Sequence, residues 1–64
     1  MTPKIEYDRE VDAAYVRLSK NEVDVSEQVS DDLIVDFDAE GRIVGLEILE
    51  ASRHLAPDAL NAAA

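Results

Sequence analysis

The segment from Leu33 to Leu49 constrains the fold most, because it holds two β-rich stretches on either side of one turn. Leu33–Phe37 and Ile43–Leu49 are dominated by β-branched and other apolar residues, which favour strands. The turn between them, Asp38–Gly41, ends in a glycine that can adopt a positive φ angle without steric cost. This pattern predicts a β-hairpin.

The register of this hairpin has two solutions. A two-residue turn at Glu40 and Gly41 would make one face of the ribbon wholly apolar. Its pairs would be Phe37 with Val44, Val35 with Leu46, and Leu33 with Ile48. A type I turn with a bulge at Gly41 slips the register by one residue and leaves both faces partly apolar. Its pairs would be Phe37 with Ile43 and Ile34 with Leu46.

In either register, a second face of the hairpin keeps apolar side chains. Ile34, Ile43 and Leu49 cannot all share a face with Leu33, Val35 and Phe37. A helix or a second subunit must cover what remains, because large exposed apolar patches are rare on monomers. Ile34, Ile43, Leu49 and the strand residue Tyr15 are therefore our interface candidates, although packing within the sheet is the ordinary role of such a tyrosine.

Weaker patterns precede the hairpin. Ile5–Tyr7 alternates apolar and polar residues and predicts a short strand. Residues 14–19 alternate in the same way, but a helix over residues 10–18 is the competing interpretation. Val23, Val25 and Val29 indicate a third strand, broken at residues 26 and 27. Polar turns are expected at residues 8–12, 20–22 and 30–32.

The pattern changes after residue 50. Residues 51–55 can begin a helical turn, and Pro57 suits the first position of a helix that continues to residue 62. Leu55 and Leu60 would dock this helix on the sheet. We therefore predict an α+β fold, mostly β, in which an antiparallel meander of four or five short strands is followed by a short C-terminal helix. The whole chain, residues 1–64, is expected to form a single domain.

Size and charge limit the function. A chain of 64 residues without cysteine buries only about 60% of its unfolded surface and has no disulfide to compensate, so oligomerisation is expected. The net charge of −9 opposes binding to nucleic acids and anionic membranes and complements a basic protein. No secretion signal or membrane-spanning stretch is present, so we expect a cytoplasmic location, with a dimer or a basic protein partner.

One motif resembles a metal site. The carboxylates of Asp36, Asp38, Glu40 and Glu47, with Gly41, nearly fit the calcium-loop pattern D-x-[DN]-x-[DN]-G-x5-E. Such a loop lies between two helices, whereas these residues are flanked by predicted strands. We therefore expect neither a metal ion nor a cofactor.

No catalytic set emerges either. His54 has no second histidine or cysteine with which to bind metal, and no nucleophile is evident even if Glu50 orients its ring. The clustered carboxylates Asp31–Asp32 and Asp8, Glu10 and Asp12 lie in predicted turns, where we expect solvation instead of the burial that acid–base catalysis requires. The sequence therefore predicts a protein that is not an enzyme.

Two stretches resemble a known family. They are Tyr7-Asp8-x-Glu10-x-Asp12-Ala13-x-Tyr15-Val16-Arg17-Leu18 and Asp36-Phe37-Asp38-x-x-Gly41-Arg42-Ile43-Val44-Gly45-Leu46-Glu47-Ile48-Leu49-Glu50-Ala51-Ser52. They resemble the small bacterial proteins grouped as domain of unknown function 2283. The resemblance covers residues 4–55 and leaves residues 56–64 as a helical tail. It implies a compact β-meander with a C-terminal helical piece and no known catalytic residues. Some members are suspected antitoxins that pair with small basic proteins.

The leading hypothesis is thus an acidic interaction module that neutralises a basic, toxin-like partner. The positive charge of that partner would be matched by the carboxylates of Asp31, Asp32, Asp36 and Asp38. The alternatives are a structural homodimer and a domain that binds calcium or another ligand through carboxylates.

Overall fold

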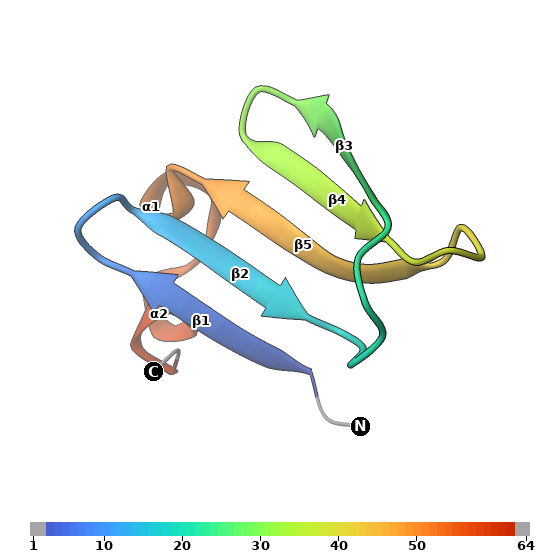
Figure 1. Cartoon of the computed structure of the whole chain (residues 1–64). Helices are drawn as coiled ribbons and strands as arrows, with labels where there is room; N and C mark the ends of the chain where they lie inside the picture. Colours follow the sequence, from blue (N-terminus) through green and yellow to red (C-terminus); the bar gives the residue numbers. More distant parts are fainter. Residues whose placement is uncertain (1–2, 63–64) are drawn as a thin grey trace.

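The computed structural model describes residues 3–62, which form one five-stranded antiparallel sheet and two short helices (Figure 1). The elements are β1 (Lys4–Asp8), β2 (Ala13–Arg17), β3 (Val25–Ser30), β4 (Leu33–Phe37), β5 (Ile43–Leu49), α1 (Ala51–His54) and α2 (Pro57–Ala62). The predicted fold class is confirmed, with two short helices instead of one. The sequence also predicts that Ala63 and Ala64 fray, but these two residues lie outside the described residues.

The strands lie in the order β1-β2-β5-β4-β3, which departs from a simple meander. A simple meander would place β3 beside β2. Instead β3, β4 and β5 run as a meander, and β5 then pairs with β2, so that the last strand in the sequence is the central strand of the sheet (Figure 1).

The two ambiguous segments before the hairpin are both strands. Residues 13–17 form β2, so the helical alternative for residues 10–18 is wrong. β3 runs without a break through Ser26 and Glu27, where an interruption was expected. This strand lies at the edge of the sheet and all six of its residues are exposed, so neither polar side chain has to be buried without a partner.

The β4–β5 hairpin contains both predicted registers. At the turn, Gly41 has a φ of 79° and Phe37 pairs with Ile43, as the bulged turn requires. Further along, Val35 pairs with Leu46 and Leu33 with Ile48, as the tight turn requires. A register shift between Asp36 and Phe37 reconciles them, because β5 holds one extra residue there.

The register of the whole sheet assigns each residue to one of two faces, because directly paired residues point to the same side. One face carries the apolar row Ile5, Val16, Leu46 and Val35 and the row Tyr7, Ala14, Ile48 and Leu33. The helices pack on this side (Figure 1), where Ala51 is fully buried and Tyr7 borders a hollow with Pro57 and Leu60. We call it the helix-covered face and its opposite the open face.

Both helices lie where the sequence predicted helical structure, α1 in place of the expected helical turn and α2 as the expected helix. α2 begins at Pro57, with Asp58 in its first turn. α1 begins after Glu50, whose φ of 50° turns the chain sharply out of β5. Within residues 3–62 no helix is long and apolar enough to cross a membrane.

Candidate functional site

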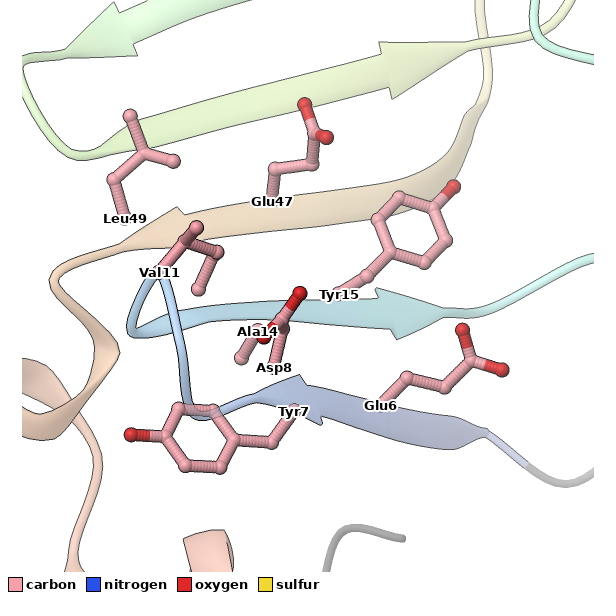
Figure 2. Close-up of a pocket in the computed structure, with 9 residues that line it drawn as sticks. Glu6, Tyr7, Asp8, Val11, Ala14, Tyr15, Glu47 and Leu49 are labelled. Carbon is pink, nitrogen blue, oxygen red and sulfur yellow. The ribbon is translucent and has the colours of Figure 1, made fainter.

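The open face carries a shallow hollow of about 290 Å³ over β1, β2 and β5 (Figure 2). Its lining consists of Glu6, Tyr7, Asp8, Val11, Ala13, Ala14, Tyr15, Glu47 and Leu49. The floor is mainly apolar, while three carboxylates, those of Glu6, Asp8 and Glu47, lie around it. No lysine or arginine belongs to the lining. The hollow therefore combines apolar surface with negative charge.

The strand register explains why these side chains meet. Glu6, Tyr15 and Glu47 are direct neighbours on β1, β2 and β5, and Asp8, Ala13 and Leu49 form the next row. Figure 2 shows the side chains of Tyr15, Glu47 and Leu49 on the same side of the sheet. The small side chain of Ala13 leaves the space between the larger ones open.

Tyr15 crosses the central strand to reach a buried carboxylate. Its hydroxyl donates a hydrogen bond of 3.1 Å to Oδ2 of Asp36, while Ser26 donates one of 2.6 Å to Oδ1. Gly45 permits this path, because a Cβ atom there would lie only 2.7 Å from Cζ of Tyr15. Burial, and next the hydrogen bond to the Asp36 carboxylate, raise the pKa of Tyr15 above its usual 10.0. β2, β3 and β4 are thus joined across the open face.

Three of the four interface candidates share the open face. Tyr15 and Leu49 line the hollow, and Ile34 pairs with Glu47 beside it. Ile43 is separate, because it pairs with Phe37 and so belongs to the helix-covered side, where it is 49% exposed. The sequence singled out these residues as interface candidates but could not place them on one face, because strand order decides which neighbours β2 receives.

The four carboxylates of the calcium-like motif do not converge. Asp36 is buried beneath Tyr15, and Asp38 uses Oδ1 to accept backbone hydrogen bonds from Glu40 and Arg42. Those bonds, the Arg42 amide first, lower the pKa of Asp38. Glu47 lies on β5 rather than on a helix. Residues 3–62 contain no group of three or more potential metal ligands placed to hold an ion.

Three of the four aspartates proposed to match a partner's charge are engaged inside the chain. Asp36 is 5% exposed, Asp38 closes the hairpin turn, and Asp32 binds Nε2 of His54 at 2.8 Å. Asp31 alone of the four is exposed without a side-chain bond among the described residues. His54 is therefore oriented by Asp32, whereas Glu50 pairs with Arg53.

The strongest charge feature of the sequence is a concentration of acidic residues in one segment, which the motifs above did not reveal. Residues 21–41 contain eight acidic side chains and no lysine, arginine or histidine. This segment is the β3–β4 ribbon with its flanking turns. Among its acids, five are exposed and make no side-chain hydrogen bond or ion pair with the described residues: Glu22, Asp24, Glu27, Asp31 and Glu40. A count of charge by segment would have located this acidic edge.

A second network joins the β1–β2 turn to α1. The carboxylate of Asp12 accepts hydrogen bonds from the Tyr7 hydroxyl at 2.6 Å and from the Ser52 amide and hydroxyl at 3.0 and 2.7 Å. Its backbone carbonyl accepts one from the Ala51 amide. Asp12, which lies in the distant β1–β2 turn, thus caps the N-terminus of α1. Glu50, the residue at the N-cap position, makes no side-chain cap hydrogen bond itself.

The hydrogen bonds of Asp12 and of Tyr15 make the stability of the fold decrease at opposite ends of the pH scale. The Tyr7 and Ser52 bonds lower the pKa of Asp12 below its usual 3.8, so their contribution is present above 3.8 and is lost as pH falls through the folded-state pKa. The raised pKa of Tyr15 acts oppositely: its contribution is present below 10.0 and is lost as pH rises through the folded-state pKa. Thermal unfolding followed by circular dichroism across pH should show both limbs.

Two variants separate the limbs. Tyr15→Phe should weaken the alkaline limb and leave the acid limb in place. Asp12→Asn should weaken the acid limb and also part of the alkaline limb, because the hydrogen bond to the Asp12 carboxylate raises the pKa of Tyr7. An acid limb of unchanged size in Asp12→Asn would contradict this assignment.

Fold and site define a small acidic sheet protein with one uncovered face. The chain belongs to the family described as protein of unknown function (DUF2283), whose model matches residues 4–52. No curated protein and no solved structure matches the chain.

Six of the residues that carried the resemblance have structural roles in this chain. Tyr7, Asp12 and Ser52 form the cap network. Tyr15, Asp36 and Gly45 form the crossing on the open face. The fold therefore accounts for these six positions of the pattern.

Proposed function

We propose that this protein is a non-enzymatic interaction module that binds a basic protein through the open face of its sheet. The observation that carries the proposal is the hollow over β1, β2 and β5, with its apolar floor and the carboxylates of Glu6, Asp8 and Glu47. Apolar contact supplies affinity, and the surrounding charges select the partner and speed its approach.

The dimensions suit such an interface. The described chain measures 33 × 27 × 17 Å, so its broad face is comparable to the roughly 800 Å² that each partner buries in a standard interface. Tyr15, Ile34 and Leu49 provide partly buried side chains on that face, with Leu49 at the end of β5. A partner with lysine or arginine at its interface would bring opposite charge to Glu47, because the carboxylate of Glu6 already pairs with Lys4 at 3.8 Å.

A basic partner suits this face better than a second copy does. A dimer built on the open face would place the same three carboxylates in both halves of the interface, where the strands contribute Lys4 and Arg17 as basic side chains and Lys4 is already paired with Glu6. Like charges in contact are costly. A small toxin-like protein, neutralised by this chain in the cytoplasm, is the specific form of the proposal. The net charge of −9 supports a basic partner.

The proposal predicts a position-dependent effect of charge reversal. A photo-crosslinking residue placed at Ile34, in the cell that makes the protein, should trap a basic protein. With that partner purified, Glu47→Lys should weaken binding about tenfold or more, because one attraction becomes a repulsion. Binding of the unchanged chain should also weaken with added salt, because salt screens exposed charges.

Asp58→Lys is the matched control, since it makes the same charge change on the exposed surface of α2. It should alter the affinity much less than Glu47→Lys. Crosslinking only to another copy of this chain would favour the structural homodimer. Equal effects of the two reversals, or affinity that does not change with salt, would contradict the proposal.

A further inference from the structure

β3 is an edge strand whose outer side is unoccupied. It is the last strand in the order β1-β2-β5-β4-β3, and its six residues are all exposed. Figure 1 shows it at the border of the sheet, with β4 on one side only. An edge strand presents a row of backbone donors and acceptors that another extended chain can pair with.

The charge around this edge is of one sign. The segment 21–41 has eight acidic residues and no basic one, and Asp24, Glu27 and Asp31 lie within β3 or next to its ends. None of these three side chains makes a hydrogen bond or ion pair with residues 3–62. The edge therefore repels acidic segments and attracts those rich in lysine or arginine.

We propose that β3 accepts an extended basic segment of the partner as an added strand of the sheet. This inference rests on the proposed function, since it names how the basic partner would contact a second surface of the chain. Backbone hydrogen bonds would supply the pairing, and alternate side chains would supply the specificity.

The side chains of β3 define the order of residues in that segment. Val25 and Glu27 are two residues apart and face the helix-covered side, opposite Phe37 and Val35. Val25 and Phe37 border a hollow of about 410 Å³, together with Asp24, Glu27 and Asp38. An apolar side chain beside Val25 and a lysine or arginine beside Glu27 would match this surface.

A second copy of the chain matches the edge poorly. Two β3 strands pairing with each other would bring together two segments that are wholly acidic in their charged residues. The register shift between Gln28 and Ser30 also interrupts regular pairing near the end of the strand. Charges that point inward and bulges are two ways in which natural sheets prevent their edges from pairing with copies of themselves.

A short synthetic peptide tests the pairing directly. Every second residue of the peptide is threonine, and the residues between the threonines are valine and lysine in alternation. Valine and lysine therefore share one face of the extended peptide. Added to the isotope-labelled protein, it should shift the NMR signals of β3 and β4 and slow amide exchange in β3. Two further peptides carry backbone N-methyl groups, one on all threonines and the other on all valines and lysines.

The two N-methylated peptides have the same charge but block opposite edges of the extended chain. One should bind at least about tenfold more weakly than the unmodified peptide, while the other should bind nearly as well. Glu27→Lys should also weaken binding about tenfold, whereas Asp58→Lys should have much less effect.

Equal binding of all three peptides would overturn strand pairing and leave a purely electrostatic contact. Absence of binding, or signal shifts confined to the hollow of the open face, would overturn it as well. Each of these results leaves the proposed function to be decided by the Glu47→Lys comparison, because that variant alters the opposite face of the sheet near β2. The two proposals can therefore fail separately.

Discussion

Gly45→Val is expected to lower the free energy of unfolding by about 3 kcal/mol. A side chain at this position overlaps the ring of Tyr15, since even a Cβ atom would lie 2.7 Å from Cζ. Overpacking costs about 1–3 kcal/mol, and displacing the tyrosine leaves the buried Asp36 carboxylate without one partner, at a similar cost. The better strand propensity of valine offsets up to about 1 kcal/mol. Urea unfolding followed by circular dichroism measures the change.

A double-mutant cycle shows whether Tyr15 is the cause. In a Tyr15→Ser background the space above Gly45 is free, so Gly45→Val should cost at least about 1 kcal/mol less than in the unchanged chain. Additive effects of the two substitutions would mean that the glycine is required for another reason.

Val44→Ala is expected to lower the free energy of unfolding by about 2 kcal/mol. Val44 is 1% exposed and is the largest fully buried side chain among the described residues. The substitution removes buried apolar surface and leaves a cavity in a core that few residues fill. Since a domain of this size has a total stability of roughly 3–10 kcal/mol, the loss should be plain in the urea midpoint.

Val11→Ala is the matched control, because Val11 is 68% exposed in the β1–β2 turn. The same chemical change should alter stability by less than about 0.5 kcal/mol there. Similar losses for both variants would show that Val44 is not packed as the structure describes.

Local patterns predicted the strands of the hairpin to the residue. The stretches Leu33–Phe37 and Ile43–Leu49 are β4 and β5 without change, and Pro57 begins α2 as its ring geometry favours. These elements could be predicted because propensity, turn chemistry and proline geometry act within a few residues of sequence.

The register and the strand order could not be obtained in this way. The extra residue in β5 lies within the strand, so a bulged turn and the pairing of Val35 with Leu46 coexist, whereas turn rules offered one or the other. Nothing local indicates that Val16 pairs with Leu46 rather than with β3. The composition of the open face depends on that long-range pairing.

The hydrogen-bond partners of the polar side chains could not be predicted from the sequence either. Asp12, Asp32 and Asp36 look alike in the sequence, as acids in or near turns and strand ends. In the fold, Asp12 accepts hydrogen bonds from a backbone amide of α1 and from Tyr7. Asp32 pairs with His54. Asp36 accepts hydrogen bonds from Tyr15 and Ser26. Each of the three sets contains a residue more than twenty positions away, so only the assembled sheet distinguishes a capping acid from a surface charge.

The central place of β5 bears on how the chain can fold while it is being made. The β1–β2 hairpin leaves the ribosome early, but its neighbour in the sheet is made after β3 and β4. Neither the β1–β2 hairpin nor the β3–β4 ribbon can complete its packing until residue 49, the end of β5, has emerged. The chain should therefore fold in one late step, after β5 has been translated. Contacts this distant in sequence slow folding, and the waiting strands are where premature association would start.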